Sequence, residues 1–367
     1  MYKRQKLFSI FAPFVLSITC AYGVDTFFFI AGDGGTNNAN DRNQWVNLST
    51  YNSSGDTFLF QLFPVGTDER VSLDKGNFRA GAINAVQSSV ITAESNVIFN
   101  RYCLGDLQPD GSVTFNDANV KNPNPIVFNS DFNVANMFAR INHYVDFQFA
   151  DAESITLTAK EINLNSITNA HFTKTTAGEV NIHVDGRFLW VGGNNLYLGS
   201  STGFIDSFYA DAIDVMGNPK TLLFDFYVNK IDSASTSFVS DNGTISATVN
   251  LHINKLSADG PIFYFGTTTK LDDSVINIDF TYADVEGLSA GEYEILYVDS
   301  WSEGFADGGS LTDFNINDDL LNAMGIEHNF TWDGESLVLN VVPEPAHIAA
   351  VLAAAALALA AVRRRRR

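Results

Sequence analysis

Short runs of alternating apolar and polar residues dominate the chain over 24–341. A period of two is typical of a β-strand with one buried face. The clearest runs are 154–158, 161–165, 180–184, 195–198, 248–253 and 275–280. Clusters of Gly, Asn and Asp separate the runs, and turns with positive φ favour these residue types. The pattern predicts an all-β body with very little helix.

Two all-β architectures fit this pattern. One is an irregular right-handed parallel β-helix or solenoid, and the alternative is a set of antiparallel β-sandwiches. The runs follow one another too closely for helical crossovers, which favours the solenoid, although their spacing shows no regular repeat. Helix-like patterns occur only at 318–324, which Gly325 closes, and at 133–140.

The runs become longer after position 274. Trp332, Asp333 and Gly334 form a tight-turn sequence between two apolar runs, as in a β-hairpin. We therefore divide the body into a solenoid-like part, 24–274, and a C-terminal β cap, 275–341. Pro343 then prevents further strand pairing, because proline has no backbone N–H.

Residues 1–23 have the pattern of a secretory signal peptide. Basic residues come first, an apolar stretch over 7–20 follows, and Ala21 and Gly23 form a small-x-small cleavage site. A buried N-terminal helix would have to contain Pro13. A lipid anchor on Cys20 would need Leu at position 17, which is Ser17 here, and a very small residue at position 19.

The other end has three parts in order. Val342, Pro343, Glu344 and Pro345 precede an apolar segment over 346–362, whose last fifteen residues are uninterrupted and rich in Ala. A basic cluster ends the chain: Arg363, Arg364, Arg365, Arg366 and Arg367. Fifteen helical residues span about 22 Å, less than the ~30 Å hydrocarbon core, so this helix would be a weak membrane anchor. The arginines would stop transfer on the cytoplasmic side. An Ala-rich helix outside the membrane is the competing interpretation.

This tripartite tail (342–367) resembles the PEP-CTERM sorting signal of Gram-negative-type bacteria. The resemblance implies that an exosortase in the inner membrane recognises the Pro-Glu-Pro segment and removes the tail. It further implies that the processed protein reaches the cell surface or an extracellular polysaccharide matrix. It covers about 25 residues and carries no implication for the body.

A second resemblance concerns the start of the body. Asp33-Gly-Gly-Thr36, Trp45 and the segment 54–60 are similar to the opening of autotransporter-type β-helix passengers, although the usual first Trp is missing. This similarity also favours the solenoid.

The charge of the chain excludes one class of partner. Eight of the 22 basic residues lie within the two ends, so the interval 7–362 holds 14 basic residues against all 42 acidic ones, a net of −28. Such a body repels phosphate backbones, so no nucleic-acid partner is expected. Cleavage after Gly23 would leave Cys103 as the one cysteine, without a disulfide partner, and nothing near it indicates a catalytic His.

Candidate chemistry in the body is sparse. The doublets Asp272-Asp273 and Asp318-Asp319 offer paired carboxylates, as in polysaccharide hydrolases, but the Gly-His-Gly and Arg-x-Lys motifs of the β-helical pectin hydrolases do not follow the first doublet. Calcium could bind the Asp/Asn-rich segments 33–41 and 315–319, although neither has the order of an EF-hand loop. His183 and His252 lie singly in strand patterns without zinc-ligand spacing.

We therefore expect a surface or matrix protein, exported by way of the inner membrane and exosortase, with a structural or adhesive body, no catalytic residues and no required cofactor. The alternative is a secreted carbohydrate-binding or polysaccharide-cleaving β-helix protein. Exposed aromatic side chains on a flat face would favour carbohydrate binding, and burial of Trp45, Trp190, Trp301 and Trp332 would weaken that alternative.

Overall fold

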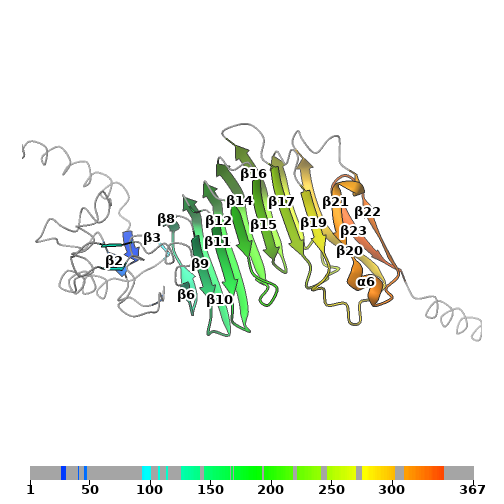
Figure 1. Ribbon diagram of the computed structural model, residues 1–367, viewed down its shortest axis with the longest axis horizontal. Helices are drawn as coiled ribbons and strands as arrows, with labels where there is room; N and C mark the ends of the chain where they lie inside the picture. The colour runs from blue at the N-terminus through cyan, green and yellow to red at the C-terminus, as the bar shows by residue number, and fades with distance from the viewer. Residues whose placement is uncertain are drawn as a thin grey trace, which may run out of the picture.

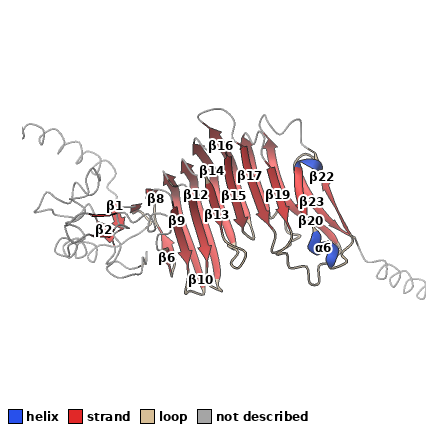
Figure 2. Cartoon of the chain, in the orientation of Figure 1, coloured by secondary structure: helices blue, strands red, loops and turns tan. Residues whose placement is uncertain are grey.

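The computed structural model shows an elongated body built from two parallel β-sheets that pack face to face (Figure 1). It describes residues 26–29, 40, 45–47, 93–100, 106–107, 113–114, 125–140, 144–165, 167, 169–191, 194–217, 221–240, 246–269, 275–301 and 310–342. Figure 2 shows that strands dominate this part of the chain and that loops and turns connect them.

The larger sheet has 13 strands. Its order is β2 (Trp45–Asn47), β1 (Thr26–Phe29), β3 (Asn96–Asn100), β8 (Asn136–Arg140), β10 (Ser154–Asn165), β12 (Glu179–Val191), β14 (Ser207–Gly217), β16 (Ile231–Ser240), β18 (Phe263–Thr269), β20 (Gly291–Trp301), β23 (Ser336–Val341) and β22 (His328–Trp332), and β7 (Phe132–Asn133) also pairs with β10.

The second sheet has eight strands. Its order is β21 (Phe314–Asn317), β19 (Val275–Asp279), β17 (Ser246–His252), β15 (Thr221–Tyr227), β13 (Asn195–Leu198), β11 (Asn169–Lys174), β9 (Tyr144–Phe149) and β6 (Ile126–Phe128). A separate two-stranded sheet consists of β4 (Asp106–Leu107) and β5 (Val113–Thr114).

From β9 to β21 the chain alternates between the two large sheets, and each strand pairs in parallel with the strand one full turn earlier. This winding is a parallel β-solenoid, which confirms the predicted fold class. The antiparallel-sandwich alternative is wrong for this part of the chain. Side chains that hydrogen-bond between neighbouring turns are 26, 25 and 27 residues apart in the sequence at three of the turns. At the last turn they are 38 residues apart.

One continuous apolar core fills the space between the sheets. Inward residues alternate with outward ones, as in β9, where Val145, Phe147 and Phe149 are buried. Rings from opposite sheets meet there: Phe172 lies 6.1 Å from Phe188, and Trp190 lies 5.9 Å from Phe224. Burial of large aromatic side chains supplies most of the stabilisation of such a core.

Each long strand of the 13-stranded sheet bends at one position. In β10 the buried residues Ala159 and Ile162 flank the outward Lys160 and Glu161, and the register with β12 shifts at this point. Gly266 occupies the equivalent place in β18, because its neighbours pair with Ser233 and Ser235 around an unpaired Ala234. The bends stack on one another and form a corner along the solenoid.

The same corner explains a wrong prediction. Residues 133–140 form β7 and β8 rather than a helix. Val134 and Met137 are both buried with helix-like spacing because the bend between the two strands inserts one residue into the alternation.

Antiparallel pairing occurs at the C-terminal end of the larger sheet. Parallel pairing continues through β19, β20 and β21, beyond position 275, and β23 then pairs with β20 and β22 in antiparallel fashion. Gly334, with φ of 105°, makes the predicted hairpin turn between β22 and β23. The predicted helix at 318–324 is α6 (Asp319–Ala323), preceded by a 3-10 turn, η4 (Leu311–Asp313), and followed by Gly325 at φ of 73°.

Within the described ranges, no helix is long and apolar enough to cross a membrane. The expected signal peptide and the expected membrane helix at 346–362 lie outside the described residues.

Candidate functional site

The outward face of the eight-stranded sheet carries a ladder of amide side chains. Four neighbouring strands of this sheet, β15, β17, β19 and β21, each place one Asp or Asn at the same register position. They do so because parallel strands in register repeat their outward positions. The Asn250 amide donates to Asp225 over 3.2 Å, Asn277 donates to Asn250 over 2.6 Å, and Asn315 donates to Asn277 over 3.0 Å. We call these four residues the amide ladder. Its hydrogen bonds tie each turn of the solenoid to the next.

His252 joins this ladder to a second outward column. Its Nε2 lies 2.7 Å from Asp225 Oδ1 and its Nδ1 lies 2.9 Å from Asp279 Oδ2, so a carboxylate stands at each ring nitrogen. The imidazole also stacks on Tyr227 at 3.9 Å between ring centroids and is only 8% exposed. The ring is therefore fixed at both nitrogens and on the face that stacks on Tyr227.

The electrostatics of this group follow from its contacts. Burial by itself would raise the pKa of Asp279, but hydrogen bonds from Thr281 and His252 outweigh it and hold that pKa below its ordinary value. Burial raises the pKa of Tyr227 well above its ordinary value, and the neighbouring Asp225 adds to the effect. Asp279 is therefore a carboxylate and Tyr227 a neutral phenol at neutral pH.

Nearer the N-terminal end, the same face carries a stack of rings. His171 lies between Tyr144 and Tyr197, with ring centroids 4.7 and 4.2 Å away. Burial lowers the pKa of His171 to about 4. The ring is neutral at physiological pH and packs as an aromatic side chain.

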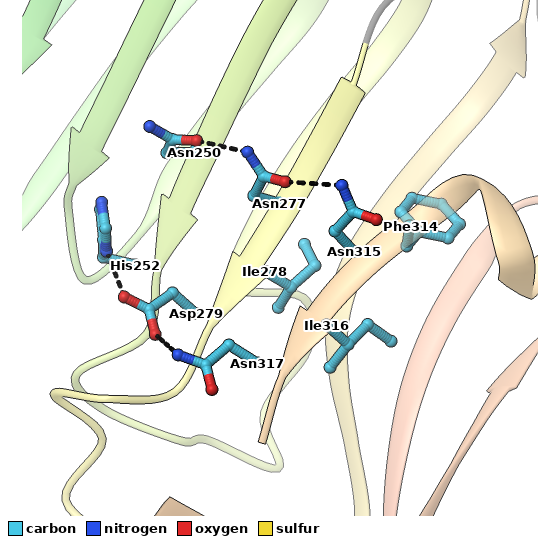
Figure 3. Close-up of a pocket in the computed structure, with 9 residues that line it drawn as sticks. All are labelled: Asn250, His252, Asn277, Ile278, Asp279, Phe314, Asn315, Ile316 and Asn317. Carbon is cyan, nitrogen blue, oxygen red and sulfur yellow. Dashed lines mark hydrogen bonds and ion pairs between the residues drawn. The ribbon is translucent and has the colours of Figure 1, made fainter. Parts of the chain in front are cut away.

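A depression of about 550 Å³ lies over β17, β19 and β21 (Figure 3). Its lining comprises Asn250, His252, Asn277, Ile278, Asp279, Phe314, Asn315, Ile316 and Asn317. Figure 3 shows the amides of the ladder in one line and the His252–Asp279–Asn317 chain in a second line beside it. The depression therefore presents hydrogen-bonding groups that are already engaged with one another.

This arrangement limits the chemistry of the group. A glycosidase pair needs an open space between two carboxylates for the sugar and water. The His252 ring fills the space between Asp225 and Asp279, and each of the two accepts a further hydrogen bond from an asparagine, Asn250 or Asn317. The pair is consequently suited to holding adjacent turns together, whereas glycoside hydrolysis would need another site.

The structure gives a structural role to Asp318, one member of a predicted acidic pair. Asp318 precedes α6, accepts a hydrogen bond from Asn322 and pairs with His328 at 3.0 Å. Asn315 belongs to the amide ladder and Asn317 Oδ1 accepts from the backbone of Asp319. Asn317 and Asp318 of the segment 315–319 thus use their side-chain oxygens in contacts within the protein. The described part of the chain contains no cluster of three or more His, Cys, Asp or Glu arranged to hold a metal ion.

Other predicted site residues lie outside the described residues. These are Ala21, Gly23, Cys103, Asp272, Asp273, Pro343, Glu344, Pro345 and Arg363 to Arg367, together with the segment 33–41 apart from Asn40. Val342 is described, and its backbone N–H donates to Glu327 O over 2.8 Å. Folded structure therefore reaches the first residue of the predicted sorting motif.

The tryptophans bear on the carbohydrate alternative. Trp190 is fully buried and donates to Ile167 O over 3.1 Å, and Trp332 packs half-buried against Phe314. The side chains of Trp45 and Trp301 lie outside the described set. Trp190 therefore offers no ring face to a sugar, and the half-buried Trp332 is engaged with Phe314.

Sequence reasoning missed the amide ladder, although a signal for it exists. The tripeptides that begin at Asp225, Asn250, Asn277 and Asn315 share one form, an amide or acid followed by an apolar and then a polar or aromatic residue. Their unequal spacing conceals the repeat.

Comparison of the chain with protein-family models, with curated proteins and with solved structures gave no match. The class that the fold defines is a two-sheet parallel β-solenoid with an antiparallel C-terminal hairpin. Its eight-stranded sheet carries the outward amide ladder and the carboxylate-flanked His252.

Proposed function

We propose that this chain is an exported bacterial surface or extracellular-matrix protein, in which the β-solenoid is a rigid structural and adhesive rod and the tail is a PEP-CTERM sorting signal. In this proposal an exosortase cuts near Pro343, Glu344 and Pro345 and releases the rod from the inner membrane. The body needs no catalytic residue or cofactor for this role.

The boundary between body and tail is the observation that carries the proposal. β23 ends at Val341, Val342 makes a last backbone bond to Glu327, and the next residue is a proline that cannot donate. The Pro-Glu-Pro segment thus follows the last described residue of the folded body directly in the sequence, and the lack of a backbone N–H on proline disfavours strand pairing there, as a processing site requires.

The construction of the rod supports a structural role. The core runs continuously through the turns, and hydrogen-bonded side chains join neighbouring turns on the outside. In solenoids each turn is stabilised mainly by its neighbours, so such ties add to the cohesion of the whole rod.

Intact-mass analysis of the protein from its native host tests this proposal. We expect a surface or extracellular form that lacks residues 1–23 and those after about 345. A triple alanine variant of Pro343, Glu344 and Pro345 should retain the tail and remain in the membrane fraction, while Glu335→Ala, a control in the exposed hairpin, should be processed normally. Recovery of wild-type protein that still carries Arg363 to Arg367 would refute the sorting role.

Carbohydrate binding is the second candidate. It is favoured by a row of partly exposed aromatic side chains on the 13-stranded sheet, opposite the amide ladder.

A further inference from the structure

The outward face of the 13-stranded sheet carries one aromatic row just before the corner. Successive strands from β12 to β20 place the following residues at one register position: His183, Tyr209, Asp232, Tyr264 and Tyr297. We call these five residues the aromatic row. All of them are partly exposed to solvent.

The rings form two stacked pairs. His183 lies on Tyr209 at 4.5 Å with 13° between the ring planes, and Tyr264 lies on Tyr297 at 5.6 Å with 6° between the planes. Each pair therefore turns one ring face away from its partner and toward β16, the strand between the pairs. Asp232 of β16 stands in the space between the two tyrosines.

We call the space between the Tyr209 and Tyr264 rings, above Asp232, the slot. Its width suits a positively charged group. Tyr209 and Tyr264 are two strands apart, which corresponds to about 9.5 Å at the usual separation of β-strands. A cation midway between them would lie about 5 Å from each ring, within the ~6 Å range of cation–π attraction. The Asp232 carboxylate between the rings supplies the counter-charge.

The Asp232 carboxylate differs from the other acidic groups near the row because it has no hydrogen-bond partner among the described residues. Each ring of the row has its own acidic partner, with His183 bonded to Asp185, Tyr209 to Asp211, Tyr264 to Asp299 and Tyr297 to Glu335. By contrast, no described residue forms a hydrogen bond or an ion pair with the Asp232 carboxylate. A bound cation would give the Asp232 carboxylate an ion-pair partner.

We propose that the aromatic row binds a polysaccharide with free amino groups, such as a glucosamine polymer, and that the slot formed by Tyr209, Asp232 and Tyr264 takes one protonated amine. The carboxylates of Asp211 and Asp299 beside the slot accept hydrogen bonds from sugar hydroxyls. This proposal rests on the proposed function and names the ligand of the rod.

Two features favour a polysaccharide over a peptide. The row crosses the middle of a sheet whose backbone groups are already paired, so it offers no edge for strand addition, the usual way in which a sheet takes up an extended peptide. The row also runs across the strands along the solenoid, and a polymer with a regular repeat can follow it. The strongly acidic body attracts a cationic polymer and repels one that carries uronates or phosphates.

Calorimetric titration of the full purified chain tests the proposal. The probes are a glucosamine hexamer, an N-acetylglucosamine hexamer and hexalysine, all at low ionic strength. We expect the glucosamine hexamer to bind most tightly. Asp232→Asn should weaken its binding about 3-fold, as expected for loss of one partly exposed charge pair. The charge-matched control Asp259→Asn, in an exposed loop, should leave binding unchanged.

Ring variants separate the ring face from the hydroxyl. Tyr264→Leu should weaken binding about 2- to 5-fold, the range of an exposed cation–π contact, whereas Tyr264→Phe keeps the face and should bind like the wild type. A circular dichroism spectrum unchanged from wild type shows that each variant is folded.

Three results would overturn the proposal. Equal binding of the acetylated hexamer would show that the amine is not recognised. Equal effects of Asp232→Asn and Asp259→Asn would show that only the overall charge matters. Tighter binding of hexalysine would assign the slot to a peptide. None of these titrations involves the sorting tail, so they can fail while the processing experiment succeeds, and the reverse.

Discussion

Gly266 tests the physical account of the corner most directly. Its position in β18 faces the backbone of β16, and a Cβ added there would stand 2.0 Å from Ala234 O, whereas real Cβ contacts begin near 3.0 Å. Gly266→Ala therefore requires the two strands to separate by about 1.0 Å at the bend. Gly186, in the bend of β12, is a matched case in which the added Cβ would stand 2.7 Å from Lys160 O, so a shift of about 0.3 Å relieves it.

The difference in these distances sets the expected magnitudes. Separating β16 from β18 by about 1 Å weakens about two backbone hydrogen bonds, each worth about 1 kcal/mol net, and overpacking adds about 1 kcal/mol. Replacing Gly by Ala also lowers the conformational entropy of the unfolded chain, which stabilises the folded state by about 0.4–1 kcal/mol. We expect Gly266→Ala to lower the free energy of unfolding by about 2 kcal/mol, and Gly186→Ala to change it by less than about 1 kcal/mol.

Urea unfolding followed by tryptophan fluorescence measures both variants, because Trp190 is fully buried in the core. An equal m-value with a lower midpoint would show that stability alone has changed. Ala234→Ser keeps a Cβ on the exposed partner residue and should behave like the wild type. If Gly186→Ala proved as destabilising as Gly266→Ala, close backbone approach would not be the reason for glycine in the corner.

Three further predictions concern the described core and ladder. His252→Ala should lower the free energy of unfolding by about 2 kcal/mol in urea titrations, because it leaves two aspartates close together without their shared partner. For His171, whose folded pKa is lowered to about 4 from 6.5, the unfolded chain takes up a proton first as the pH falls. Its contribution to stability is therefore complete above pH 6.5 and is lost as the pH falls toward 4, and His171→Gln should flatten the stability–pH curve over this interval. Trp190→Phe should cost about 2 kcal/mol in the same titration, since Ile167 O loses its buried donor and a cavity forms.

The sequence predicted the strands well because alternation is a local property. The runs at 180–184, 195–198 and 275–280 lie in β12, β13 and β19 as expected. The runs at 154–158 and 161–165, by contrast, are two halves of the single strand β10. The bend at Lys160 shifts the alternation by one residue, so one bent strand has the sequence pattern of two short ones.

The repeat and the candidate site could not be predicted in the same way. Strand pairing between turns is non-local, and the connecting segments differ in length, so the last turn of the amide ladder spans 38 residues where earlier ones span 25 and 27. An outward Asn gives no sign of its partner in the sequence. The aromatic row depends on register in the same way, because Tyr209, Asp232 and Tyr264 become neighbours only when three strands are aligned.

The two outward faces differ in how their polar groups are satisfied, and this difference separates their roles. On the amide ladder each side chain serves its neighbour, and His252 engages a carboxylate with each nitrogen, so little hydrogen-bonding capacity remains for a ligand. On the aromatic row the side groups are also paired, except that Asp232 stands between two ring faces without a described partner. A satisfied face stabilises the rod, whereas the Asp232 carboxylate, which lies between two ring faces without a described partner, gains free energy when a cation binds beside it. Under the proposed function, the amide ladder holds the turns of the solenoid together, and the aromatic row is the face that would bind the polysaccharide.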